Sequence, residues 1–274
     1  MPLRDIAACV EIAEALTTLS VSAAQAIQRR RDGDVRLKRD NSPVTAADEA
    51  AEVLIREGLA RLDLGLPIIS EELAERERPH LGGADFVFVD PLDGTREFIA
   101  GRGEYTVNIG VVAAGEPILG VIAAPALGLV WRGVVGRGAE RLHFTDEAVE
   151  KPKAAQPIHT RPRPRHELLV MTSRSHLDAG TQAYFDTLPQ ARQIACGSSI
   201  KFCRLAEGTA DLYPRLSPTR DWDIAAGHAI LAAAGGGVVA PDGTALRYGT
   251  PELRIPAFIA FGDPDAAPGA AITG

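Results

Sequence analysis

Apolar residues recur at helical spacing near the start of the chain. They lie three or four positions apart between residues 3 and 29, at Leu3, Ile6, Val10, Ala13 and Leu16. This spacing places them on one face of a helix. A second helix is predicted to begin at Thr45, because Thr45 and Asp48 have the spacing of a capping box.

The middle of the chain has the pattern of β-strands. Four segments rich in β-branched residues are separated by glycines and prolines, at residues 85–90, 105–113, 117–124 and 128–135. A shorter strand is predicted from Leu66 to Ile69. The sequence contains no internal repeat, so these elements do not belong to a repeat array.

The second half alternates strands and helices after a proline-rich segment. Residues 150–165 hold four prolines and a basic run, Arg161 to Arg165, and we interpret this segment as a solvated linker. After it, strands are predicted at 168–173, 192–196 and 211–216, and helices at 177–187, 199–207 and 223–234. The weakly polar run Ile224–Ala240 is shorter than the roughly 20 residues of a membrane-spanning helix and contains Gly235 to Gly237. It predicts a buried helix followed by a strand, and no transmembrane segment.

Carboxylates follow the predicted strand that begins at Asp85. Pro91 and Gly94 stop the strand, so Asp90 lies at its end and Asp93 on the turn. With the Leu92 carbonyl, the two side chains can converge on one point, and such oxygen ligands favour Mg²⁺ or Mn²⁺ over zinc. A plain turn would explain the same residues.

Two more acidic pairs lie at element ends. Glu71 and Glu72 follow the strand that ends at Ile69, and Asp221 and Asp223 open a helix, where they could simply complement the helix dipole. Three acidic clusters in one chain favour a metal site over three separate structural explanations.

These clusters resemble the three signature motifs of the inositol monophosphatase superfamily, the lithium-sensitive, magnesium-dependent phosphatases. The motifs are Ser70-Glu71-Glu72, Asp90-Pro91-Leu92-Asp93-Gly94-Thr95 and Trp222-Asp223-Ile224-Ala225-Ala226-Gly227. Within the superfamily, the chain is most similar to 3'(2'),5'-bisphosphate nucleotidases of the bacterial CysQ type. That similarity lies in the segments 41–48, 103–109, 173–176 and 197–203.

The resemblance implies a fold and a division into lobes. We expect a mixed α+β and α/β protein, a layered α-β-α-β-α sandwich of the inositol monophosphatase and fructose-1,6-bisphosphatase type. Residues 1–160 would form an α+β lobe with most metal ligands, and residues 161–274 an α/β lobe with Asp223 and the nucleotide pocket. The active site would lie between the lobes.

The resemblance also implies a metal centre with two or three Mg²⁺ ions. Glu71, Asp90 and the Leu92 carbonyl would hold the first ion, and Asp90, Asp93 and Asp223 the second. Glu71 would also anchor a third, weaker ion and thereby count among the catalytic residues. Glu72 would either reach a metal through water or stand in solvent.

Catalysis would depend on residues beside the metals. The resemblance pairs the Thr95 hydroxyl with Asp48 to orient and deprotonate the nucleophilic water. The scissile phosphate would lie at Gly94 and Thr95, next to Asp223, where a short helix begins. Helix capping alone would also explain Asp48.

Recognition of a second phosphate would distinguish a nucleotidase from an inositol phosphatase. Lys201, His176 and the backbone at Ser198 and Ser199 could supply hydrogen-bond donors. Solvent-exposed or capping roles would equally explain His176 and Lys201. Arg96 stands where lysine is frequent in the nucleotidase group; it keeps the charge and changes the hydrogen-bond geometry.

Charge and cysteine content narrow the class of partner. The 274 residues include 29 basic and 36 acidic ones, a net charge of −7, which argues against a nucleic-acid-binding surface. Three cysteines without a CxxC pair indicate a reducing compartment, and Met1 to Val10 does not resemble a secretory signal. We expect a cytoplasmic enzyme, free or peripheral on the cytosolic face of the inner membrane.

Three activities fit these patterns. The first is hydrolysis of the 3'-phosphate of adenosine 3',5'-bisphosphate, or of its 5'-phosphosulfate form, in sulfate assimilation. The second is the same chemistry on inositol 1-phosphate or another small phosphate monoester. The third is a non-catalytic regulator that binds magnesium or a nucleotide, which the complete set of carboxylates disfavours.

Overall fold

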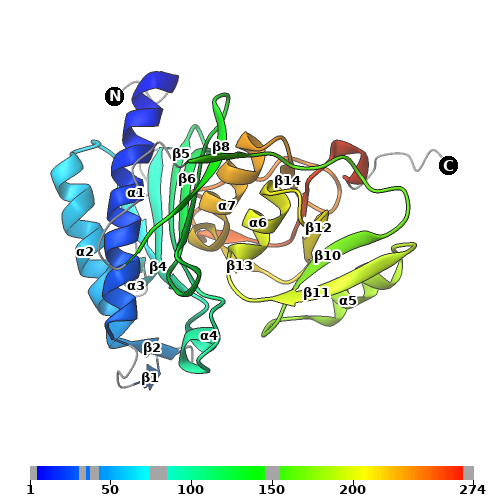
Figure 1. Ribbon diagram of the computed structural model, residues 1–274, viewed down its shortest axis with the longest axis horizontal. Helices are drawn as coiled ribbons and strands as arrows, with labels where there is room; N and C mark the ends of the chain where they lie inside the picture. Colours follow the sequence, from blue (N-terminus) through cyan, green and yellow to red (C-terminus); the bar gives the residue numbers. More distant parts are fainter. Residues whose placement is uncertain (1–4, 31–34, 38–42, 75–84, 146–154, 268–274) are drawn as a thin grey trace.

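The structure is a computed structural model that describes residues 5–30, 35–37, 43–74, 85–145 and 155–267. Helices and sheets alternate in layers (Figure 1). The outer layer contains α1 (Ile6–Gln28) and α2 (Ala46–Leu62), which pack on the larger sheet. On the opposite face of that sheet lie α7 (Asp221–Ala233) and α6 (Ile200–Ala206), then the smaller sheet, then α5 (Ala179–Asp186). This arrangement is the predicted α-β-α-β-α sandwich.

The larger sheet collects the strands predicted for the middle of the chain. Its order is β3 (Ile68–Ser70), β4 (Phe86–Asp93), β5 (Thr106–Ala113), β6 (Glu116–Ala124), β7 (Leu129–Val134), β8 (Gly138–His143) and β9 (Gln156–Ile158). Strands β3 and β4 are parallel, so both carboxyl ends, each followed by acidic residues, lie at the same edge. The division of the chain into lobes at residue 160 stays a prediction.

The smaller sheet has the order β11 (Ala191–Cys196), β10 (Leu168–Ser173), β12 (Leu212–Arg215), β16 (Phe258–Phe261) and β14 (Gly237–Val239). Strands β10, β11 and β12 are parallel. The loops after them therefore leave the sheet on one side. Short elements complete the described chain: β1 (Val35–Leu37), β2 (Pro43–Thr45), α3 (Glu71–Ala74), α4 (Thr95–Ile99), the 3₁₀ turns Pro125–Leu127 and Pro264–Ala266, β13 (Thr219–Arg220) and β15 (Arg254–Ile255).

The linker prediction was wrong for residues 156–158, whereas residues 159–165 form neither helix nor strand. Gln156–Ile158 forms the edge strand β9, where Pro157 is tolerated because an edge strand can lack a backbone donor. Arg161 is not solvated as predicted, since its guanidinium donates to both carboxylate oxygens of Asp211 at 2.8 Å. Residues 150–154 lie outside the described part of the chain.

Other element predictions also need correction. Strands β8 and β16 were not predicted. The helix predicted from residue 177 begins at Ala179, because Asp178 caps its first turn by accepting from the Thr181 N–H at 2.9 Å. The last predicted helix begins at Asp221 instead of residue 223.

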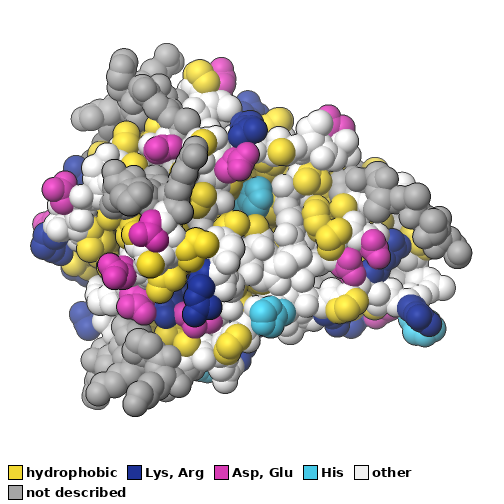
Figure 2. Space-filling view, turned by 90° about the horizontal axis from the view of Figure 1, so that it is seen from above, with side chains coloured by type: hydrophobic (Ala, Val, Ile, Leu, Met, Phe, Trp, Pro, Cys, Tyr) yellow, Lys and Arg dark blue, Asp and Glu magenta, His cyan; other side chains and the backbone are white. Residues whose placement is uncertain are grey.

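Helix α1 is long and apolar enough to span a membrane, and 44% of its most apolar window is buried inside the protein. It packs on β6 and β7, with Leu16, Val21 and Ile27 in the core. Many of the apolar residues of α1 therefore pack in the core of the protein. On the face in Figure 2, acidic and basic side chains of the described residues are interspersed.

Candidate active site

The metal-binding motif predicted at Asp90–Asp93 lies where β4 leaves its regular pairing with β5. The ladder is irregular between Asp90 and Asp93, which lets the chain turn toward the cavity. Asp90 is buried and its Oδ1 accepts the Leu92 N–H at 3.0 Å. Gly94 follows with a φ of 90°, and a Cβ there would lie 2.9 Å from the Glu104 carbonyl oxygen. The turn therefore requires glycine at this position.

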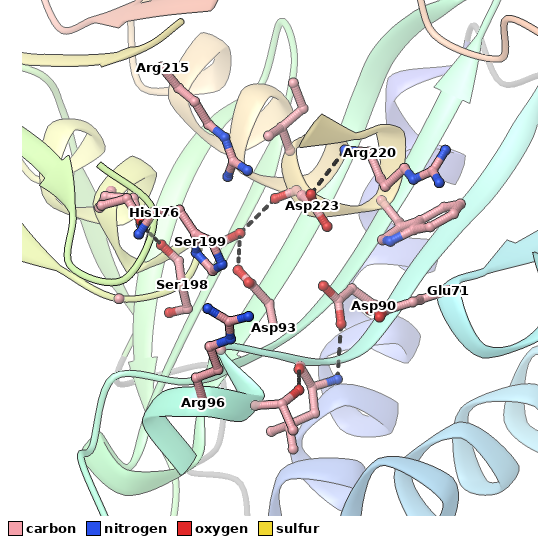
Figure 3. A pocket seen from close by; sticks show the side chains of 18 of the residues that line it. Glu71, Asp90, Asp93, Arg96, His176, Ser198, Ser199, Arg215, Arg220 and Asp223 are labelled. Carbon is pink, nitrogen blue, oxygen red and sulfur yellow. Dashed lines mark hydrogen bonds between the residues drawn. The ribbon is translucent and has the colours of Figure 1, made fainter. Parts of the chain in front are cut away.

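The second acidic pair divides between two environments. Glu71 lines the cavity at the start of α3, as predicted (Figure 3). Glu72 does not stand in solvent, because it is 7% exposed. Its negative charge is close enough to Asp48 to raise the pKa of that carboxyl. Beneath them, the Ser70 hydroxyl donates to Glu52 Oε1 at 2.7 Å and so ties β3 to α2. Glu71 and Glu72 are consecutive residues at the start of α3, so their side chains point in different directions.

Three glycines bring Asp223 to this edge of the larger sheet. Gly110, Gly120 and Gly133 are paired side by side across β5, β6 and β7. Helix α7 lies directly on them, and a Cβ at Gly120 would come within 2.1 Å of the Ala226 carbonyl oxygen. This close approach places the first turn of α7 beside the end of β4.

Ser199 joins the Asp93 carboxylate at the end of β4 to the backbone of Asp223 in α7. Its hydroxyl lies 2.9 Å from Asp93 Oδ2 and 2.7 Å from the Asp223 carbonyl oxygen, and it accepts from Asn108 Nδ2 at 3.0 Å. The Asp223 carboxylate is held by the Thr219 hydroxyl and by the Arg220 N–H at 3.0 Å. Figure 3 shows Asp90, Asp93 and Asp223 facing one another.

The negative charges around Asp93 favour the binding of a cation. Burial and the nearby Asp223 carboxylate raise the pKa of Asp93, while Lys201 opposes the rise. Glu71, Asp90, Asp93 and Asp223 line one cavity of about 1000 Å³ together with Leu92. Within the described ranges, the side chains do not form a group of three or more His, Cys, Asp or Glu residues that could hold a metal in their present positions. The oxygen donors and their mutual repulsion still fit hard divalent cations.

Asp48 has both of the roles that its sequence context allowed. Its Oδ2 accepts from the backbone and hydroxyl of Thr45 at 2.8 and 2.6 Å, which completes the capping box of α2. Its Oδ1 accepts the Thr95 hydroxyl at 3.2 Å. Burial raises the pKa of Asp48 to about 6. The pairing of Thr95 with Asp48 is therefore present in the structure.

The predicted phosphate-recognition residues lie on the opposite wall of the cavity. His176, Ser198, Ser199 and Lys201 all line it. Lys201 is not a solvated surface lysine: it is 3% exposed, and its Nζ donates to the carbonyls of Cys196 and Ser198 at 3.2 and 2.5 Å. The exposed His176 lies at the rim, where partial burial and then the charges of Arg215 and Arg96 lower its pKa.

Sequence reasoning missed Arg215 as a site residue and gave Arg96 no role. Both line the cavity beside His176, and Arg215 comes from the end of β12 (Figure 3). Arg215 belongs to no motif, and only its place near the end of a predicted strand of the second half could have marked it. One end of the cavity, the acidic end, contains Glu71, Asp90, Asp93 and Asp223 together with Arg220. The other, the cationic end, contains Arg96, His176 and Arg215 together with Glu97.

Comparisons with known proteins agree with this architecture. The model of the inositol monophosphatase family matches residues 5–266. The 3'(2'),5'-bisphosphate nucleotidase CysQ of Escherichia coli strain K12 is 42% identical over 84% of this chain and 91% of its own length. The Salmonella typhimurium protein of that name is 41% identical over 86% of this chain and 93% of its own.

Solved structures place the chain in the same group. A CysQ from Bacteroides thetaiotaomicron, a bacterial member of the inositol monophosphatase family, superposes with a TM-score of 0.79 at 34% identity and covers 92% of this chain and 97% of its own. An inositol monophosphatase from Anabaena superposes with a TM-score of 0.74 at 24% identity, covers 93% of this chain and 92% of its own, and shows the shared fold. The chain belongs to the inositol monophosphatase family.

Proposed function

We propose that this chain is a magnesium-dependent 3'(2'),5'-bisphosphate nucleotidase that releases the 3'-phosphate of adenosine 3',5'-bisphosphate and leaves AMP. The observation that carries the proposal is a single cavity of about 1000 Å³ in which carboxylates predominate at one end, beside Arg220, and cations predominate at the other, beside Glu97. A substrate with two phosphates can place one at each end. Relatives that bear this activity in their names, at up to 42% identity over most of the chain, support it.

The acidic end would hold two Mg²⁺ ions. Glu71, Asp90 and the Leu92 carbonyl are proposed for one ion, and Asp90, Asp93 and Asp223 for the other; Glu71 would anchor a third. When bound, such ions neutralise phosphate charge and lower the pKa of a water molecule. The chain's own contribution is to keep these oxygens on one wall through the end of β4, the start of α3 and the first turn of α7.

Proton removal from the attacking water is assigned to the pair Thr95 and Asp48. The Thr95 hydroxyl lies 3.2 Å from Asp48 Oδ1 and 3.1 Å from the Leu92 carbonyl oxygen, and its one hydrogen can serve either acceptor. Donation to Asp48 would leave the lone pairs of this hydroxyl to orient a water toward the phosphate. Asp48 then takes up a proton through this hydroxyl. Its raised pKa of about 6 is suited to a base that works near neutral pH.

The cationic end would bind the phosphate that is not cleaved. Arg215, Arg96 and His176 face the cavity and can donate to phosphate oxygens. The buried ammonium group of Lys201 adds positive charge to the cavity, although two of its hydrogen bonds go to the carbonyls of Cys196 and Ser198. Trp222, which also lines the cavity, offers an apolar surface for an adenine ring.

The proposed setting is sulfur metabolism in the cytoplasm, where the reaction would remove an inhibitory by-product. The 5'-phosphosulfate form presents the same 3'-phosphate and is a second proposed substrate. Hydrolysis of inositol 1-phosphate is the alternative activity. The positive charges of Arg96 and Arg215 favour a substrate with a second phosphate over inositol 1-phosphate.

The test is phosphate release in millimolar Mg²⁺ from adenosine 3',5'-bisphosphate, inositol 1-phosphate and fructose 1,6-bisphosphate side by side. We expect kcat/KM for the nucleotide to exceed the others by about 100-fold, or roughly 2.7 kcal/mol of transition-state binding. Equal rates on all three would discard the nucleotide pocket and keep the metal site. Absence of turnover would favour the regulator. Loss of phosphate release on addition of Li⁺ is expected for the enzyme.

A further inference from the structure

One carboxylate outside the cavity joins the loops that form its cationic wall. Glu104, in the segment between α4 and β5, accepts from Arg174 Nε and Nη2 at 2.7 Å each. Its Oε2 also accepts the Gly197 N–H at 2.8 Å. Arg174 and Gly197 follow β10 and β11, so a single side chain of the first half of the chain fixes two loops of the second half.

Other hydrogen bonds also link the two loops to the first half of the chain, among them one from Asn108 Nδ2 of β5 to the Ser199 hydroxyl at 3.0 Å. The Ser175 hydroxyl donates to the buried Glu97, and the Ser199 hydroxyl lies 2.9 Å from Asp93 Oδ2. Arg174 Nη2 also donates to the Ala195 carbonyl at 2.7 Å, which ties the loops to each other. Glu104 therefore holds both loops, which are themselves joined, and does not hold only the side chain of Arg174.

Contact between Gly197 and this segment is close. A Cβ at Gly197 would lie 2.7 Å from the Glu104 carbonyl oxygen and 2.8 Å from Glu97 Cγ. The loop therefore packs closely against α4 and the segment that follows it, and the carboxylate of Glu104 restrains the loop from moving away. The position of His176 and Ser198 relative to Asp93 is set by these opposing contacts.

We infer that Glu104 is a positioning residue that sets the distance between the metal-binding end of the cavity and the loops that hold the second phosphate. The inference rests on the proposed function. Neither Glu104 nor Arg174 lines the cavity, so both act through the loops. Misplacement of His176 and Ser198 weakens substrate binding, while the carboxylates of the metal end keep their positions. The expected signature is a change in KM with little change in kcat.

The contacts also predict an order among variants. Glu104→Ala removes the acceptor of both loops, whereas Arg174→Ala removes one partner and leaves the Gly197 N–H bonded. Glu104→Gln keeps an acceptor oxygen and loses the charge. We expect KM for adenosine 3',5'-bisphosphate to rise by about tenfold in Glu104→Ala and by less in the other two, with kcat within about threefold of wild type.

The control is an ion pair of the same kind at the opposite end of the same strands. Glu167 accepts from Arg192 Nε at 2.9 Å, next to β10 and β11, and both side chains are more than half exposed. Glu167→Gln is expected to leave KM and kcat unchanged. It tests whether loss of any glutamate–arginine pair on these strands changes KM, or only loss of the pair that holds the loops.

The experiment measures KM and kcat for adenosine 3',5'-bisphosphate and for 3'-AMP, which lacks the second phosphate. Support is a KM rise for the bisphosphate that exceeds the rise for 3'-AMP, in the order given above. An unchanged KM for the bisphosphate, an equal rise for both substrates, or a fall of kcat alone would overturn the inference. If Glu104→Ala does not fold, Glu104→Gln and Arg174→Ala decide the question with the same criteria.

The wild type distinguishes this inference from the proposed function. A wild-type chain that does not hydrolyse the bisphosphate overturns the proposed function. The dissociation constant of the bisphosphate is then compared between the wild type and Glu104→Ala by isothermal titration calorimetry, where weaker binding to the variant supports the positioning role and equal binding overturns it.

Discussion

Asp48 combines a structural and a proposed catalytic role in one buried side chain, and its variants can separate the two. One oxygen completes the cap of α2 and the other accepts the Thr95 hydroxyl. An asparagine keeps an oxygen for one of these partners and cannot take up a proton. We expect Asp48→Asn to lower kcat by about 100-fold or more, as measured by phosphate release.

The stability of the same variant should move the other way. Burial raises the pKa of Asp48 from 3.8 to about 6, so the native state binds the proton more tightly than the unfolded chain. The carboxylate therefore reduces stability as pH rises through this range, and the reduction is complete above pH 6. We expect thermal melts at pH 7 to show Asp48→Asn at least as stable as the wild type. A clear loss of stability would mean that the hydrogen bonds of Asp48 to Thr45 outweigh the cost of burying its charge.

The pH profile of the wild type follows from the same shift. Below about pH 6 Asp48 is protonated and cannot act as a base, so kcat should fall as pH decreases through this value. Bound cations would move the midpoint lower, because positive charge favours the carboxylate. A kcat that is flat from pH 5 to pH 8 would contradict the role of Asp48 as the base.

Asp93 tests the metal assignment. The Asp223 carboxylate and burial raise its pKa, so the two acidic groups repel each other. We expect Asp93→Asn to abolish turnover and to melt no lower than the wild type in EDTA, since that repulsion is removed. Addition of Mg²⁺ should raise the wild-type melting temperature more than that of the variant. Equal Mg²⁺ shifts in both proteins would remove Asp93 from the metal site.

Among the elements, α7 depends on the absence of side chains beneath it. A Cβ at Gly120 would come within 2.1 Å of the Ala226 carbonyl oxygen, and backbone cannot give way as a flexible side chain does. We expect Gly120→Ala to destabilise the fold by about 1–3 kcal/mol and to lower kcat, because Asp223 moves with the helix.

A glycine with ordinary space around it provides the matched control. A Cβ at Gly262 would meet Thr160 Cβ at 3.5 Å, which is a normal van der Waals distance. Gly262→Ala is expected to change neither kcat nor stability by a comparable amount. Equal effects of the two substitutions, in chemical denaturation and in phosphate release, would show that the packing of α7 on the glycines does not position Asp223.

Most of the elements that sequence reasoning predicted have a strong local signal, although the short apolar strand β16 was not predicted. Strands β4 to β7 are rich in apolar residues, and α1 has regular helical spacing. Strands β8 and β9 were missed because local pattern is weak in both. Within β8 only Ala139 and Leu142 are buried, and β9 contains Pro157 at an edge. Pairing with a neighbouring strand, which the sequence does not show, makes them strands.

Across the whole molecule, the predicted site residues lie around one cavity, with Asp48 just behind it, although they come from distant segments. The acidic residues could be predicted as site residues because each of their motifs lies at the end of a strand or at the start of a helix. Arg215 and Glu104 could not be found in this way. The partner of Glu104 lies 70 residues further along the chain, and the contact exists only after the two sheets have packed together.

A second carboxylate joins the layers at a distance from the cavity. Glu207 Oε1 accepts from Trp131 Nε1 at 2.7 Å and from Arg141 Nη1 at 3.0 Å, and its Oε2 accepts from Arg204 Nη1 at 3.0 Å. Its side chain is 5% exposed. It connects β7 and β8 of the larger sheet to the end of α6. Its contribution should therefore be to stability and not to substrate binding.

Glu207→Gln should separate these two kinds of contribution. The amide can still accept from Trp131 but loses its charge toward two arginines, so we expect a loss of about 1–3 kcal/mol in chemical denaturation. KM and kcat should be unchanged. Glu116→Gln is the control, because the pair of Glu116 with Arg247 is 63% and 62% exposed and should contribute little. A rise of KM in Glu207→Gln as large as that expected for Glu104→Ala would mean that any weakening between the layers disturbs the cavity, and the special position of Glu104 would be lost.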